Sequence, residues 1–111
     1  MSTKELTKEA KILLYHLYKE YTIRLDNGMS RSEARKFDSP ESIQKTLFPD
    51  WYVSDINDCM LELGRHECLS NTIASGAIYE AELTTEAITS IEGQKKETLL
   101  NVVNFIANFI P

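Results

Sequence analysis

Apolar residues recur at helical spacing over the first quarter of the chain. This stripe consists of Leu6, Ala10, Leu13, Leu14, Leu17, Tyr18 and Tyr21. The spacing predicts a helix from about Thr3 to about Leu25, which a capping box of Ser2 and Glu5 would open. The sequence Asp26-Asn27-Gly28 is a strong stop signal for that helix.

Two shorter helices are predicted next. Ser30 and Glu33 form a second capping box, which predicts a helix that ends near Phe37. Ser39-Pro40 is the favoured pairing of an N-cap with a first helical residue and predicts a third helix, which Pro49 closes.

The segment after Trp51 begins with another predicted helix. Ser54 is a good N-cap, and Gly64 occupies the place where a left-handed C-terminal cap is expected. Between them lies an apolar stripe of Ile56, Cys59, Met60 and Leu63.

A hairpin and another short helix follow. Two strand-like runs, from Cys68 to Ile73 and from Ala77 to Leu83, flank Ser75-Gly76, where a turn is expected. Thr84 then caps a short helix that Gly93 ends.

The pattern from residue 95 to residue 110 is again helical. Its apolar stripe consists of Leu99, Val102, Val103, Ile106, Phe109 and Ile110. Such a stripe must be covered. It packs against the first helix of the same chain or, alternatively, forms a homodimer interface with a second copy, which by two-fold symmetry is isologous.

The length and composition fit one α+β domain. The chain has 111 residues, 42% of them hydrophobic and 26% charged, which is enough for a single core. We expect a mostly helical body over residues 1–93, a hairpin over about 67–83, and a packing or dimerisation helix over 94–111. No apolar run approaches the roughly 20 residues that span a bilayer, and no signal-type stretch opens the chain. Two cysteines do not make a disulfide framework, so the expected location is the cytoplasm.

The negative charge is concentrated in the second half of the chain. The formal net charge is −5, with nine Lys/Arg against eight Asp/Glu in residues 1–50, and three against nine in residues 51–111. Between Val53 and Glu92, one cation, Arg65, stands against eight acidic residues. A nucleic acid backbone would be repelled by a surface of this composition.

Candidate sites for metal binding and catalysis have little support. Cys59, His66 and Cys68 lack the paired ligands of structural zinc sites, and Cys59 lies on an apolar stripe. No nucleophile stands at an interpretable spacing from His16, and the scattered glycines form no phosphate-binding loop. We therefore expect a non-enzymatic protein without a cofactor.

The order helix, hairpin, helix and the phrase "ELTTEAI" after the hairpin resemble the second half of the winged-helix superfamily of small bacterial and phage regulators. The resemblance covers roughly residues 8–92. It implies that the helix after Ser54 is a recognition helix, that Ser75-Gly76 is the tip of the wing, and that the function is DNA binding in transcription regulation.

Two kinds of partner remain open. DNA would be bound by Ser54 and Asn57 of the recognition helix and by cations, of which Arg31, Arg35 and Lys36, with Arg24 nearby, form a candidate basic patch. The candidate nucleic-acid residues are Arg24, Arg31, Arg35, Lys36, Ser54, Asn57 and Arg65. Alternatively, an acidic face binds a basic protein partner, or mimics a nucleic acid. Its candidate residues are Asp55, Asp58, Glu62, Glu80 and Glu82.

Overall fold

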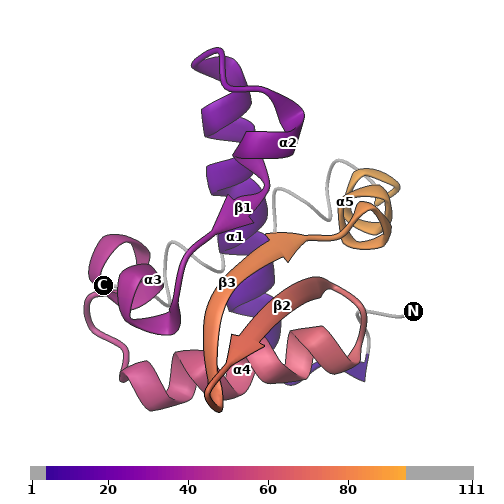
Figure 1. Ribbon diagram of the computed structural model, residues 1–111. Helices are drawn as coiled ribbons and strands as arrows, with labels where there is room; N and C mark the ends of the chain where they lie inside the picture. Colours follow the sequence, from indigo (N-terminus) through magenta and orange to yellow (C-terminus); the bar gives the residue numbers. More distant parts are fainter. Residues whose placement is uncertain (1–4, 95–111) are drawn as a thin grey trace.

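The protein folds into helices around a small antiparallel sheet, in the α+β class that the sequence predicts (Figure 1). The computed structural model describes residues 5–94. In chain order the elements are α1 (Lys8–Asp26), α2 (Arg31–Ala34), β1 (Lys36–Phe37), α3 (Pro40–Leu47), α4 (Val53–Arg65), β2 (Leu69–Ala74), β3 (Ala77–Leu83) and α5 (Thr85–Glu92). The predicted helix over 95–110 lies outside the described residues.

Hydroxyl side chains cap several helices, and three of these caps are the predicted ones. Ser30, Ser39 and Thr84 each accept a hydrogen bond from the backbone N–H three residues later. Each such bond satisfies one of the free amides at a helix start. The predicted start of the first helix is wrong: α1 begins at Lys8, and Thr7 is its cap, accepting from the N–H of Ala10.

Both predicted ends of α4 are wrong. The N-cap position is occupied by Tyr52, which makes no side-chain cap bond, so that Ser54 is already inside the helix. The helix continues past Gly64 to Arg65, and the left-handed backbone lies at Glu67, with φ 61°. Gly64 is required for another reason. A Cβ there would lie 2.7 Å from Nδ2 of Asn71 on β2, so its absence allows helix and strand to approach closely.

The hairpin agrees with the prediction, apart from a start at Leu69 in place of Cys68. Ala74 pairs with Ala77 around a two-residue turn in which Ser75 has φ 54° and Gly76 has φ 77°. Positive φ at both central residues is the conformation that matches the twist of a tight hairpin. Pairing continues to Leu69 opposite Leu83.

A third strand, β1, was missed by the sequence prediction. The helix expected to end near Phe37 ends at Ala34, and Lys36 and Phe37 pair with β3 instead, opposite Glu82 and Ala81. The sheet order is β1-β3-β2, so β2 lies at one edge. Two residues are too few to show any periodicity.

A bulge interrupts the pairing of β3 near the hairpin tip. Thr72 pairs with Glu80, but Ile73 pairs with Ile78, so Tyr79 is the extra residue and is 72% exposed. A bulge of this kind bends the strand that carries it and leaves its partner strand regular.

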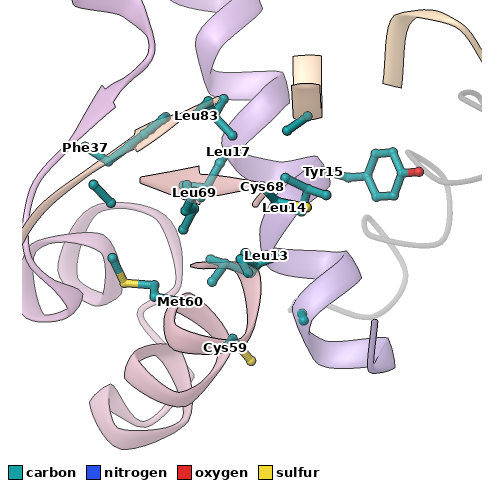
Figure 2. Close-up of a cluster of buried hydrophobic side chains, with 14 of the residues drawn as sticks. Leu13, Leu14, Tyr15, Leu17, Phe37, Cys59, Met60, Cys68, Leu69 and Leu83 are labelled. Carbon is teal, nitrogen blue, oxygen red and sulfur yellow. The ribbon is translucent and has the colours of Figure 1, made fainter. Parts of the chain in front are cut away.

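The core lies where α1 crosses α4 and the inner face of the sheet (Figure 2). Leu13, Leu14 and Leu17 of α1 are fully buried there, together with Met60 of α4 and Leu83 of β3. Complete burial of such side chains contributes about 1.5–3 kcal/mol each to folding. Within residues 5–94, no helix has the length and apolar character needed to cross a bilayer.

Candidate functional site

The solvent-facing part of α4 is divided between two kinds of side chain. At 100° per residue, Asp55, Asp58 and Glu62 fall on one side, which we call the cleft face. Ser54, Asn57, Leu61 and Arg65 fall on the adjoining side, which we call the hairpin face. The side opposite both is buried in the core. Asp58 lies only about 20° from Arg65 and about 40° from Ser54 around the helix, so the two faces meet at Asp58, whereas Asp55 and Glu62 lie farther toward the cleft.

The cleft face borders a hollow of about 430 Å³ between the start of α1, the α3–α4 connection and α4. Its lining residues are Thr7, Glu9, Asp50, Trp51, Tyr52, Asp55, Asp58, Cys59 and Glu62. Five of these carry carboxylates and two carry large aromatic rings, and no Lys or Arg is among them. We call this hollow the acidic cleft.

Glu62 closes one wall of the acidic cleft by binding the start of α1. Its Oε2 accepts from the backbone N–H of Thr7 at 2.6 Å, and its Oε1 accepts from Oγ1 of Thr7 at 2.8 Å. A carboxylate at this position also faces the positive end of the α1 dipole. Glu62, which the sequence assigns to a free partner face, is thus engaged within the chain.

The aromatic side chains of the cleft differ in how they are held. The ring of Trp51 packs against Phe48 with centroids 4.7 Å apart, and Phe48 packs against His16 at 4.6 Å. Tyr52 is 76% exposed. A fixed indole and an exposed phenol at one opening offer flat ring faces to a ligand.

The thiol of Cys59 reports the negative potential of the cleft. Its burial and the nearby carboxylates of Glu62, Glu9, Asp55 and Asp58 raise the pKa of Cys59 to about 12. Both burial and neighbouring negative charge disfavour the thiolate. Cys59 is thus a neutral thiol at physiological pH.

The hairpin face borders a second, shallower groove of about 320 Å³ between α4 and β2. Its lining residues are Leu61, Gly64, Arg65, Leu69, Asn71 and Ile73, with no carboxylate among them. Nδ2 of Asn71 donates to the carbonyl oxygen of Met60 at 2.9 Å and fixes the strand against the helix. Ile73, at the hairpin end of the groove, is 56% exposed.

The structure separates the candidate nucleic-acid residues into two groups. Ser54, Asn57 and Arg65 lie together on the hairpin face of α4. Arg31 belongs to α2, Lys36 belongs to β1, and Arg35 joins the two elements. α2 lies near the end of α1 opposite to α4 (Figure 1), whereas β1 pairs with β3 of the hairpin. With 19 residues in α1, its two ends are roughly 28 Å apart, so Arg31 does not extend the hairpin face.

Arg24 is occupied by contacts within the chain. Its Nε pairs with Glu20 at 3.0 Å, and its Nη1 donates to the carbonyl oxygens of Ala34 at 3.2 Å and Lys36 at 2.6 Å. The guanidinium also lies 4.5 Å from the ring centroid of Phe37. Arg24 thus ties α2 and β1 to α1.

Two members of the basic patch are also partly engaged. Nη1 of Arg35 donates to Oγ1 of Thr85 at 3.3 Å, and Lys36 lies 3.7 Å from Glu33. Arg31 is exposed at the start of α2.

The candidate acidic face is likewise divided. Glu80 and Glu82 pair with Thr72 and Ser70, on the outer face of the sheet, whereas Asn71 on the inner face contacts α4. Asp55, Asp58 and Glu62 are on the cleft face of α4 instead. The six residues of the candidate dimer stripe lie outside the described part of the chain.

Sequence reasoning missed most of the cleft. Thr7 and Glu9 are more than 40 positions from α4, and no local spacing connects them. Asp50, Trp51 and Tyr52 carried a usable signal, since two aromatic residues beside an acidic helix and next to a Pro are unusual core material.

Cys59 and Cys68 are both buried, free thiols. Among residues 5–94, no three or more His, Cys, Asp or Glu side chains converge as they would around a metal ion. Comparisons of the chain with protein-family models, with curated proteins and with solved structures gave no match.

Proposed function

We propose that this protein is a non-enzymatic binding module of winged-helix type. The support is the order of its elements: α3 and α4 are followed by a hairpin, whose second strand pairs with the early strand β1. On this interpretation α4 is the recognition helix and the β2–β3 hairpin is the wing.

The proposed partner is a basic polypeptide, bound in the acidic cleft. The observation that carries this proposal is the composition of the cleft: five carboxylates and two aromatic side chains around one hollow, with no lysine or arginine among the described residues that line it. A Lys or Arg side chain inserted there would meet opposite charge and an aromatic face together. Cation–π contacts contribute about 0.5–2 kcal/mol, depending on desolvation.

Trp51 provides the assay, because it is the only tryptophan of the chain and lines the cleft. The experiment is a fluorescence titration with three synthetic ten-residue peptides, in which Ser alternates with Arg, Lys or Glu. We expect saturable changes with the Arg and Lys peptides that weaken with salt, and no change with the Glu peptide.

A pair of charge-matched variants separates cleft binding from general attraction to an acidic protein. Asp55→Asn with Asp58→Asn removes two charges from the cleft, and Glu80→Gln with Glu82→Gln removes two from the outer sheet face. The cleft variant should weaken basic-peptide binding roughly tenfold, with little change in the control. Equal loss in both variants, or no binding by the wild type, would contradict the proposal.

DNA binding through the hairpin face is a second candidate, and one observation favours it. Arg65 lines the groove between α4 and β2, which has no carboxylate among its described lining residues, and Ser54 and Asn57 lie on the same side of the helix, with Asp58 at its border. Asn can pair with an adenine edge, and Ser and Arg can contact phosphates.

This candidate is tested by retention of a random pool of duplex DNA at low and at physiological salt. Asn57→Ala with Arg65→Ala should abolish retention if the hairpin face is used, and Arg31→Ala should not. If retention is lost in Arg31→Ala and kept in the Asn57/Arg65 variant, the DNA contact is on α2 instead. No retention at low salt, where attraction is strongest, excludes this candidate.

A further inference from the structure

Two of the five carboxylates in the acidic cleft lie side by side and are exposed. Asp55 and Asp58 both line the hollow, and residues three apart are neighbours on a helix surface. Neither carboxylate makes a hydrogen bond or an ion pair with a group of residues 5–94. Glu62, by contrast, already accepts two hydrogen bonds from Thr7. A cation in the cleft would therefore find its readiest acceptors at Asp55 and Asp58.

The ring of Trp51 is a rigid apolar surface in the lining of the same hollow. Phe48 packs against it with ring centroids 4.7 Å apart and is itself in contact with the ring of His16. Tyr52, which also lines the hollow, is 76% exposed. A side chain that enters the cleft therefore meets aromatic rings as well as carboxylates.

A planar cation suits this combination better than a compact one. The guanidinium of arginine presents five N–H donors in a fixed fork, stacks on aromatic faces and is weakly hydrated. The ammonium of lysine is a compact point charge that is strongly hydrated. In a hollow open to solvent, lysine would therefore keep much of its water shell, whereas arginine can stack on a ring and bond to carboxylates at the same time.

We propose that the acidic cleft is selective for arginine, whose guanidinium stacks on Trp51 while its N–H groups bond to Asp55 and Asp58. The hollow of about 430 Å³ is at the small end of the roughly 300–1,000 Å³ that is typical of ligand pockets, which fits one extended side chain. Trp51 and Tyr52 then determine the specificity, and the carboxylates supply an attraction that any cation would share. This assignment rests on the proposed binding of a basic polypeptide and adds a choice between its two kinds of cation.

The experiment compares dye-labelled ten-residue peptides by fluorescence anisotropy, a readout that does not need Trp51. In these peptides Ser alternates with Arg, with Lys, or with citrulline, the neutral planar analogue of arginine. At physiological salt we expect the full chain to bind the Arg peptide about tenfold more tightly than the Lys peptide. The citrulline peptide should not bind, because it keeps the planar shape and lacks the charge.

Variants of the rings and of the carboxylates should change different quantities. Trp51→Leu should weaken the Arg peptide to the level of the Lys peptide, and Tyr52→Leu, at an exposed position, should reduce the Arg-to-Lys ratio about threefold. Tyr79→Leu is the matched control, since Tyr79 is 72% exposed at the bulge and is not part of the cleft lining, and it should leave the ratio unchanged. Asp55→Asn with Asp58→Asn should weaken both peptides.

The possible results separate this inference from the proposed function. Equal affinities of the wild type for the Arg and Lys peptides would overturn the selectivity and leave the proposed function standing. Failure of both peptides to bind would overturn the proposed function, and the selectivity with it. A preference for Arg that falls equally in Tyr52→Leu and Tyr79→Leu, or that survives Tyr52→Leu unchanged, would overturn the role of the rings even if Trp51→Leu does not fold.

Discussion

The cleft face and the hairpin face of α4 are adjacent on one helix and differ in almost every property. The cleft face carries Asp55, Asp58 and Glu62 beside aromatic rings. The carboxylate of Glu62 accepts a hydrogen bond from the backbone N–H of Thr7 and so connects α4 to the start of α1. The hairpin face carries no charged residue apart from Arg65, and a Cβ at Gly64 would lie 2.7 Å from the side-chain amide of Asn71 on β2. One face borders an open polar hollow, and the other is packed against a strand through the Asn71 side chain.

The charge of a segment is thus not spread evenly over its surfaces. Eight acidic residues lie between Val53 and Glu92. On α4, Asp55 and Glu62 face the cleft and Asp58 lies at the border of the two faces, whereas the groove beside β2 has no carboxylate among its described lining residues. Four experiments test this contrast, in order of decreasing expected effect.

The largest effect is expected in thiol reactivity. Burial and the cleft carboxylates raise the pKa of Cys59 to about 12, and burial raises the pKa of Cys68, beside β2, to about 11. Because only the thiolate attacks, Cys59 in the native protein should react with an aromatic disulfide at pH 8 about a thousandfold more slowly than a free cysteine, and Cys68 about a hundredfold.

The thiol comparison is completed by single-cysteine variants. With Cys68→Ala present, Asp55→Asn plus Asp58→Asn should accelerate the reaction of Cys59, because two of the charges that disfavour its thiolate are gone. With Cys59→Ala present, the same substitutions should leave Cys68 unchanged. Equal acceleration of both thiols would mean that the variant opens the whole fold.

Gly64→Ala probes the hairpin face. Alanine is the better helix former by about 1 kcal/mol, but its Cβ would collide with the amide of Asn71 and break the bond to Met60. We expect a net loss of about 1–2 kcal/mol in the free energy of unfolding, measured by urea titration. In an Asn71→Ala background the same substitution should stabilise. A loss of the same size in both backgrounds would exclude this contact as the cause.

Glu62→Ala probes the cleft face. It removes both hydrogen bonds to Thr7, and we expect a loss of about 1 kcal/mol, moderated because these bonds lie at the surface. Asp58→Ala also removes one carboxylate from the cleft lining, but Asp58 makes no hydrogen bond to α1 within residues 5–94, so stability should change by less than about 0.5 kcal/mol. Thermal or urea unfolding of both variants makes the measurement, and equal losses would refute the anchoring role of Glu62.

The smallest effect concerns pH and reaches the cleft through the tilted ring contacts of His16 with Phe48 and of Phe48 with Trp51. Burial, aided by Lys19 and opposed by Glu20, lowers the pKa of His16 below 6.5. Its contribution to stability is therefore complete above pH 6.5 and is lost as the pH falls through the lowered pKa. Urea unfolding followed by Trp51 fluorescence should show less stability at pH 5.5 than at 7.5, and His16→Gln should show a smaller difference between the two.

Local chemistry made much of the fold predictable. Ser30, Ser39 and Thr84 each cap a helix as expected, and Ser75-Gly76 supplies the turn. The predictions of element boundaries failed where contacts with residues distant in the sequence determine the local structure. Ser54 is a better N-cap than Tyr52 by residue type, yet the N-cap lies two residues earlier, at Tyr52. The sequence assigns Gly64 to a helix end. The structure shows instead that a Cβ at this position would collide with Asn71, a strand residue seven positions later.

The candidate sites were less predictable for the same reason. Asp55, Asp58 and Glu62 were identified, but Glu9 completes their cleft from α1, and no periodicity links the two helices. Arg24 was grouped with surface cations, although its guanidinium is held by carbonyl groups of Ala34 and Lys36. Which polar residues are free depends on tertiary contacts, and composition does not contain that information.

The long-range bonds of α1 have a consequence for the timing of synthesis. Thr7 is hydrogen-bonded to Glu62, Tyr15 to Gln94 and Tyr18 to Glu92. Each bond can form only after the later residue of its pair has been synthesised. From residue 26, where α1 ends, to residue 94, a ribosome needs about 3–14 seconds at roughly 5–20 residues per second. The leucines of α1 can be covered earlier, once α4 and β3, against which they pack, have been synthesised. Among the described residues, the bonds of Tyr15 and Tyr18 are therefore the contacts of α1 that synthesis completes last.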